Sequence, residues 1–209
     1  MDINFATAFP DPYPEVYEQV EVLPYYRHGW HLHEKFKSIL ASGNIHVIVE
    51  IGSWVGNCTI YLAEMLPDKG TIFAVDHWLG SREHRDPRNR MNNSLLPNLF
   101  PQFLSNIIHH GLTHKVIPVR LDSLLAAQTF KELGIKPDLI YLDASHDYVS
   151  VFSDIRAWYP LLNEGGLFCG DDWNWGGSKG GVARAAKKFA SQNGLKISIE
   201  NELWWYENQ

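Results

Sequence analysis

Residues 141–148, YLDASHDY, place two acids and a histidine directly after an apolar run. Asp143 ends the run, and His146 and Asp147 follow it within four residues. A carboxylate can hold a cation, and a histidine changes its charge near neutral pH, so this segment could form one side of a reaction site. The same residues could instead only cap the helix that follows.

A second acidic segment, LFCGDDW over residues 167–173, ends another apolar run in the pair Asp171 and Asp172. If the two runs are neighbouring strands, three carboxylates meet at one edge of a sheet, where their repulsion raises at least one pKa. A divalent cation such as Mg²⁺, which prefers oxygen ligands, would relieve that repulsion. The alternative keeps the acids apart, with Asp143 as a helix cap and the pair as the start of a solvated loop.

The segment EIGSWVG, residues 50–56, has the pattern Glu-x-Gly-x-x-x-Gly at an expected strand-to-helix turn. Glycines there allow the backbone to approach a ligand closely. A dinucleotide cofactor would require G-x-G-x-x-G, whereas Trp54 stands between Gly52 and Gly56 here, which argues against an NAD-dependent oxidoreductase. A tight turn that simply requires glycine is the structural alternative.

Two further acids follow the next expected strands. TIFAVD ends in Asp76, whose carboxylate could accept both hydroxyls of a ribose. KVIPVRLD ends in Asp122, which with Ser123 could hold the amino group of an adenine. These positions matter because ligands of open α/β sheets bind beyond the carboxyl ends of the strands.

Apolar runs and helical periods alternate along the chain, which predicts a mostly parallel sheet covered by helices on both faces. Expected strands cover residues 46–52, 71–76, 115–122, 138–143, 167–173, 196–200 and 203–207, and expected helices cover 57–66, 99–111, 123–134, 148–159 and 181–194. Ser123 is the expected cap of its helix, and Gly134 and Gly194 are expected helix ends. The last two strands, joined by Asn201 and Glu202, should form an antiparallel pair.

The order of these acids and glycines resembles the class I S-adenosylmethionine-dependent methyltransferases. The resemblance implies their Rossmann-like fold, with a mostly parallel seven-stranded sheet, a C-terminal antiparallel hairpin and helices on both faces. It also implies S-adenosylmethionine as cofactor, with the acid-glycine loop by the methionine part, Asp76 on the ribose and Asp122 by the adenine. The expected cofactor-binding set is Glu50, Gly52, Ser53, Trp54, Gly56, Asp76, His77, Trp78, Asp122, Ser123 and Asp143.

DASHDY, NEGG and GDDW together resemble a narrower group, the metal-dependent O-methyltransferases of small molecules, above all those that methylate sugar hydroxyls on antibiotics. By this resemblance Asp143, Asp171 and Asp172 are the ligands of Mg²⁺ or another divalent cation, and His146 is the general base beside Asp143. The acceptor would be a small molecule with neighbouring hydroxyls, because a diol can fill two open metal positions. Asp147 is assigned mainly to capping the next helix.

The length of 209 residues suits a single domain, with an N-terminal arm and cap helix over 1–44 and a core over 45–209. The polar insert 77–98 could act as a lid, and Trp78, Trp173 and Trp175 could wall a ligand. The net charge of −6 argues against nucleic acid as the main partner. The sequence contains no transmembrane run, and Cys58 and Cys169 should be buried free thiols, which suits the cytoplasm.

Other functions stay open at this point. The chain could bind S-adenosylmethionine without turning it over, or it could be a methyltransferase-like enzyme with another reaction, such as hydroxylation. The sequence leaves the acceptor open, and it leaves association into a homo-oligomer open as well.

Overall fold

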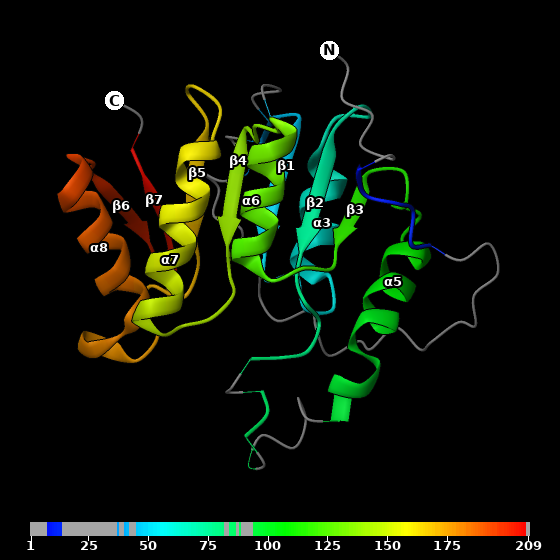
Figure 1. Cartoon of the computed structure of the whole chain (residues 1–209), viewed down its shortest axis with the longest axis horizontal. Coiled ribbons are helices and arrows are strands. Elements are labelled where there is room, and N and C mark those ends of the chain that lie inside the picture. The colour runs from blue at the N-terminus through cyan, green and yellow to red at the C-terminus, as the bar shows by residue number, and fades with distance from the viewer. Residues whose placement is uncertain are drawn as a thin grey trace.

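The computed structural model describes residues 8–13, 37, 40–41, 45–81, 84–86, 88 and 94–207. Seven strands form one sheet in the order β3-β2-β1-β4-β5-β7-β6 (Figure 1). The strands are β1 (Val47–Ile51), β2 (Thr71–Val75), β3 (Val116–Val119), β4 (Leu139–Leu142), β5 (Leu167–Gly170), β6 (Ile197–Glu200) and β7 (Leu203–Tyr206). The first five run parallel, whereas β7 pairs antiparallel with both β5 and β6. This confirms the predicted fold class.

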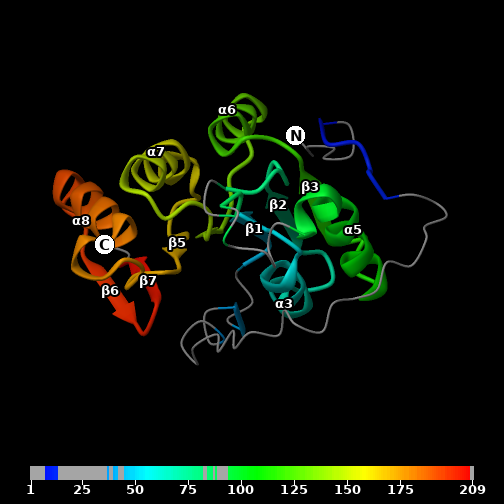
Figure 2. The same cartoon turned by 90° about the horizontal axis from the view of Figure 1, so that it is seen from below.

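Helices cover both faces of the sheet, as Figure 2 shows from below. One face carries α6 (Ser123–Leu133), α7 (Tyr148–Trp158) and α8 (Gly181–Asn193), and the other carries α3 (Asn57–Met65) and α5 (Leu99–His109). Short 3₁₀ helices lie at Leu96–Asn98, Tyr159–Leu161 and Gly177–Lys179. Each face of the sheet therefore builds its own core.

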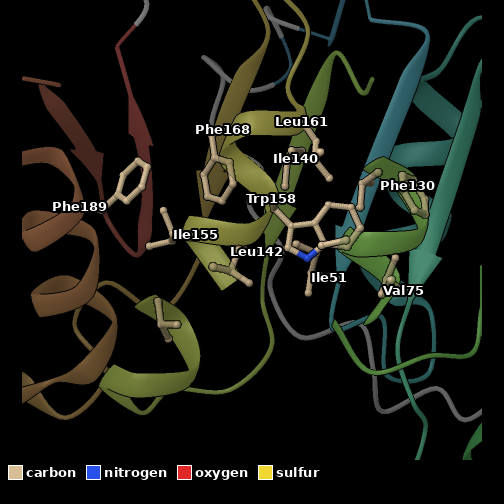
Figure 3. Packing of buried hydrophobic residues seen from close by; sticks show 14 of the residues in the cluster. Ile51, Val75, Phe130, Ile140, Leu142, Ile155, Trp158, Leu161, Phe168 and Phe189 are labelled. Carbon is tan, nitrogen blue, oxygen red and sulfur yellow. The ribbon is translucent and has the colours of Figure 1, made fainter. Parts of the chain in front are cut away.

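The two cores follow from the alternation of side chains along each strand. Ile51, Val75 and Leu142 pack around Trp158 on the face covered by α6, α7 and α8 (Figure 3). The residues one position earlier in their strands face α3 and α5 instead, as Tyr141 does. Because both faces are covered, the strands read as continuous apolar runs rather than as alternating ones.

Most of the predicted helix ends are confirmed. Gly134 and Gly194 end α6 and α8 in the left-handed conformation, with φ of 66° and 67°. The predicted cap at Ser123 was wrong by one residue: Asp122 is the N-cap of α6, and its carboxylate accepts from the Leu124 amide. Asp and Ser are equally good caps, so composition could not separate them. Both cysteines are buried and free, as predicted.

Part of the N-terminal arm packs on the edge of the sheet at β3. Phe9 is buried against Phe73 and Phe130, with ring centroids 5.6 and 5.5 Å away. The Tyr13 hydroxyl donates to the Val116 carbonyl of β3. The rest of the arm, most of the predicted cap helix and much of the 77–98 insert lie outside the described residues. None of the helices in the described part of the chain has the length and apolar character needed to cross a membrane.

Candidate active site

A cavity of about 330 Å³ opens at the carboxyl ends of β1, β2, β3 and β4, toward which the strand arrows of Figure 1 point. Its volume lies in the range of small-molecule sites. The predicted cofactor residues that line it are Gly52, Trp54, Asp76, His77, Asp122, Ser123 and Asp143. Glu50, Ser53, Gly56 and Trp78 do not line it.

Gly52 brings the loop after β1 against the loop after β4. Its φ is 96°, and a Cβ at this position would lie 1.9 Å from the Asp143 carbonyl oxygen. Both the backbone conformation and the close approach therefore require glycine. The sequence left two explanations for this glycine, the close approach of a ligand and a tight turn. Packing against the loop after β4 is sufficient to explain Gly52.

Asp76 is held between two loops at the end of β2. The amides of Trp54 and Trp78 donate to its two carboxylate oxygens at 3.0 and 2.7 Å. Burial raises the pKa of Asp76, and the two amide hydrogen bonds act in the opposite direction. A carboxylate has about four acceptor positions, so Asp76 can still accept from the hydroxyls of a ribose.

Trp78 is buried beside the cavity and is not part of its lining. It is 2% exposed and packs between Phe100 and Phe103, and its indole nitrogen donates to the Trp54 carbonyl at 2.6 Å. On the cavity side, the ring of Trp54 contacts the His84 ring with centroids 4.1 Å apart and planes tilted by 31°. No motif in the sequence indicated His84, because it lies in the polar insert.

Glu50 lies inside β1 and faces α3 rather than the cavity. It is 1% exposed, and the Thr59 hydroxyl donates to its Oε2. Burial raises its pKa to about 7, and the hydrogen bond from Thr59 acts against that shift. Glu50 therefore bonds to α3 from within the sheet and does not line the cavity.

The part of the cavity between α6 and α7 contains a residue that the sequence did not indicate. Asp154, on α7, is 6% exposed and lines the cavity beside Ser123. Burial raises its pKa to about 6, and a hydrogen bond with Ser123 acts against that shift. Asp154 lies in the middle of α7 rather than at a strand end, so the strand-end rule could not have singled it out.

Asp143, His146 and Asp172 form a cluster at the ends of β4 and β5. Each offers one atom that lies within 4.8 Å of those of the other two, and His146 Nε2 is 2.8 Å from Asp172 Oδ2. Asp172 has a φ of 60°, a conformation that is uncommon outside glycine and asparagine. Burial raises the pKa of Asp143 well above its ordinary range, and the negative charges of Asp171 and Asp172 raise it further.

Asp171 lies next to this cluster but is not a member of it. Burial raises its pKa, and the charge of Asp172 adds to that shift. A hydrogen bond from the buried Tyr141 stabilises the carboxylate of Asp171 from the α3 side. Of the three predicted metal ligands, Asp143 and Asp172 are together, and His146 completes their group in place of Asp171.

The turn between the cluster and α7 is fixed at both ends. Asp147 caps α7 as predicted, since its carboxylate accepts from the amides of Val149 and Ser150 at 3.1 Å. The half-exposed ring of Trp175 contacts the His146 ring with centroids 4.5 Å apart and planes tilted by 35°. Trp173, the other tryptophan considered for this wall, is 8% exposed and packs in the core near Trp204.

Comparison with known proteins supports an enzymatic reading of this geometry. A family model described as a methyltransferase domain matches residues 49–173, more than half of the chain. No curated protein sequence matches.

Several solved structures share the fold. An O-methyltransferase from Bacillus cereus in complex with S-adenosylhomocysteine is 18% identical, with a TM-score of 0.56 over 81% of this chain and 76% of that one. TomG from Streptomyces achromogenes, an O-methyltransferase of tomaymycin synthesis in complex with S-adenosylmethionine, is 15% identical, with a TM-score of 0.60 over 83% and 78%. The calicheamicin methyltransferase CalS11 is 15% identical, with a TM-score of 0.53 over 84% and 80%.

The match of the family model confirms the resemblance that the strand-end acids and the acid-glycine loop indicated. The similar structures agree with the seven-stranded sheet and with its helical layers. The chain belongs to the family of methyltransferase domains, with the class I fold.

Proposed function

We propose that this single domain transfers the methyl group of S-adenosylmethionine to a hydroxyl of a small polyhydroxylated acceptor, with a divalent cation at the β4 and β5 strand ends. The observation that carries the proposal is the cluster of Asp143, His146 and Asp172 beside the cavity, with His146 Nε2 2.8 Å from Asp172. Two of the similar structures are O-methyltransferases that hold S-adenosylmethionine or its product. Those facts support the cofactor and the reaction class.

The chemistry of the cluster fits a divalent cation. Carboxylates are common ligands of divalent metals, and the candidate ligand atoms of Asp143 and Asp172 lie within 4.8 Å of one another. The charges of Asp171 and Asp172 raise the pKa of Asp143, so a cation held by Asp143 and Asp172 would relieve their repulsion. When bound, the cation would supply a lower pKa for a coordinated hydroxyl and would fix its direction.

His146 is placed to take the proton of the acceptor hydroxyl. The carboxylate of Asp172 orients its ring and stabilises the imidazolium that forms. Trp175 packs against the ring on one side. The methyl group then moves from sulfur to the acceptor oxygen in an in-line displacement, which depends mainly on positioning and on exclusion of water.

The cavity supports a cofactor laid along four strand ends. Asp76 would accept from the ribose hydroxyls, and the loop around Gly52 would lie by the methionine part. Asp143 lines the same cavity and belongs to the cluster, so one residue borders both the sulfonium end and the acceptor. A shared residue of this kind places the two reacting groups side by side.

The test measures metal binding and methyl transfer separately. Mn²⁺ binding by electron paramagnetic resonance should weaken at least about tenfold in Asp143→Asn and Asp172→Asn. His146→Gln should keep Mn²⁺ binding within about threefold but lose about 10²-fold or more in the release of S-adenosylhomocysteine, assayed with catechol and monosaccharide diols. Asp147→Asn is the matched control in the same turn, because asparagine is also a good helix cap.

Different outcomes separate the alternatives. Tight S-adenosylhomocysteine binding with no Mn²⁺ binding and no transfer would favour a cofactor-binding module. Transfer that is unaffected by a chelator would contradict the metal requirement while leaving His146 as base. Consumption of an acceptor without methylation, detected by mass spectrometry, would indicate another reaction such as hydroxylation.

A further inference from the structure

The two-residue turn between β6 and β7 lies against the loop that follows β5. The Glu202 carbonyl accepts from the Trp173 amide at 3.0 Å. The indole nitrogen of Trp204, on β7, donates to the Asp171 carbonyl at 3.1 Å. The C-terminal hairpin therefore holds the loop on both sides of Asp172, a member of the candidate metal cluster.

The Glu202 side chain adds a two-point contact with Asn174. Its Oε2 accepts from the Asn174 amide and its Oε1 accepts from the Asn174 side-chain nitrogen, both at 2.9 Å. Hydrogen bonds to a carboxylate are stronger than neutral ones, and a pair of them fixes direction as well as distance. Asn174 stands between Asp172 and Trp175, so this contact fixes the backbone between two residues that touch the His146 ring.

Asp172 has a backbone conformation that depends on contacts of this kind. Its φ of 60° is uncommon for a residue with a side chain, and such residues persist where the surrounding structure determines them. The Asp172 carbonyl accepts from the Trp175 amide at 2.9 Å, which closes the loop into a turn. The Asp172 carboxylate then lies 2.8 Å from His146 Nε2. The loop therefore sets the geometry beside His146, and the hairpin holds the loop.

The contact between Glu202 and Asn174 is exposed, which separates its local effect from its effect on stability. Substitutions at the surface usually change the free energy of unfolding only slightly. The bonds of the Glu202 carbonyl and of the Trp204 indole do not depend on this carboxylate. Loss of the carboxylate should therefore loosen Asn174 while the hairpin stays folded.

We propose that Glu202 is a positioning residue of the active site, which keeps Asp172 and Trp175 against His146 by holding Asn174. Glu202 does not line the cavity, so it acts on the reaction only through these residues. The inference rests on the proposed function, since Asp172 and His146 are the proposed metal ligand and base. Replacing a residue that supports a metal ligand in this way typically changes metal affinity or activity about 10- to 100-fold.

The first test compares Glu202→Ala with Glu207→Ala, a matched loss of a carboxylate from the same hairpin. The Glu207 carboxylate accepts from the Ser198 hydroxyl at 2.6 Å, at the end of the hairpin away from the turn. Glu202→Ala should lower kcat with the diol acceptors and the affinity for Mn²⁺ by about tenfold or more each. Its affinity for S-adenosylhomocysteine should stay within about twofold, because the residues of the cavity are unchanged. Glu207→Ala should keep all three values.

A second readout follows the His146 ring directly and does not require activity. The ring current of a tryptophan displaces the NMR signals of an imidazole packed against it, so the His146 signals should differ between the wild type and Trp175→Leu. Their absence in His146→Gln assigns them. At one pH and without metal, Glu202→Ala should move these signals toward their positions in Trp175→Leu, and Glu207→Ala should leave them in place.

Exchanging the two side chains of the contact provides a rescue that a general loss of stability would not give. Asn174→Asp sets two carboxylates against each other and should lower the rate at least as much as Glu202→Ala. In the double variant Asn174→Asp/Glu202→Gln, the new amide can donate to the new carboxylate and accept from the main-chain amide beside it. The pair again carries one negative charge, so the double variant should recover the His146 signals and most of the wild-type rate.

Glu202→Ala decides the question whether or not the double variant folds. Unchanged His146 signals, or signals that move without a loss of rate, overturn the inference. Equal losses in Glu202→Ala and Glu207→Ala overturn it as well, because they would show a general effect of the hairpin. A double variant that is as stable as the wild type but recovers neither readout also overturns it. A wild-type protein with neither Mn²⁺ binding nor methyl transfer contradicts the proposed function, and the His146 signals then decide the inference alone.

Discussion

Glu50 shows how one buried acid links the stability of the protein to pH. It is almost completely buried beneath α3, and burial raises its pKa to about 7 from an ordinary value of 4.5. A carboxyl whose pKa is raised by folding stabilises the native state least when it is ionised. The contribution of Glu50 to the free energy of unfolding is therefore fully present below about pH 4.5 and is lost as the pH rises through about 7.

We expect Glu50→Gln to remove this pH dependence. The shift in the pKa of Glu50 corresponds to a loss on the order of 3 kcal/mol in the free energy of unfolding between pH 5 and pH 8. The glutamine variant should match the wild type at pH 5 and be more stable at pH 8. Urea unfolding at the two pH values measures the difference.

The control for this prediction is Glu164→Gln, which changes an exposed glutamate in the turn before β5. Its effect on the free energy of unfolding should be small and equal at both pH values. Equal destabilisation of Glu50→Gln at pH 5 and pH 8 would show that Glu50 acts through shape and hydrogen bonding rather than through its charge.

The sequence predicted the positions of some single residues but not of others. Asp76, Asp143 and Asp172 follow apolar runs, so the rule for strand ends was sufficient to bring them to one edge. Glu50 differs because it is still inside β1, where the pleat directs it toward α3. The burial of Trp78 depends on packing against α5, and residue type alone carries no information about that packing.

At the level of elements, the start of α8 supports the candidate catalytic turn. A Cβ at Gly181 would lie 2.2 Å from the His146 carbonyl oxygen and 2.4 Å from the Tyr148 amide nitrogen. The helix can approach this turn only because its first residue has no side chain. Trp175, whose ring contacts His146, lies in the segment before this helix. The position of His146 therefore depends on α8 as well as on β4.

Gly181→Ala should reduce methyl transfer, and Gly194→Ala at the other end of α8 should not. The first variant displaces the turn that carries His146, and a misplacement of about 1 Å can cost about 10²-fold in rate. The second meets no atom within 4 Å but places alanine at a φ of 67°, which costs about 1 kcal/mol of stability. The measurements are the rate of S-adenosylhomocysteine release and the free energy of unfolding. Equal rates in the two variants would contradict a role of α8 in placing His146.

The order of the elements could be read from the sequence, whereas their exact contacts could not. The alternation of apolar runs and helical periods predicted the parallel strands and the final hairpin, because each depends on local pattern. The membership of the cluster depends on the conformation after β5, where Asp172 has a positive φ and turns toward His146. Nothing in the pattern GDDW predicts which acid of the pair makes that turn.

For the binding of a charged ligand, the distribution of charge over the whole molecule matters more than its net charge of −6. Carboxylates from four elements converge on one cavity, which is lined by Asp76, Asp122, Asp143 and Asp154. S-adenosylmethionine carries a positive sulfonium, whereas its product S-adenosylhomocysteine has a neutral sulfur and is otherwise the same apart from the methyl group. A negative cavity should therefore favour the substrate over the product through an interaction that salt weakens.

We expect the affinity for S-adenosylmethionine to fall about threefold more than that for S-adenosylhomocysteine when NaCl rises from about 0.02 M to about 0.5 M. The product is the matched control, because every other contact is common to both ligands. Calorimetry is done with a chelator present, so that no divalent cation neutralises Asp143. Parallel salt dependences would show that the acids of the cavity are neutral or already compensated. A larger fall for the substrate, which Asp143→Asn reduces, would show that the protein uses its acidic cavity to bind the charged cofactor and to release the neutral product.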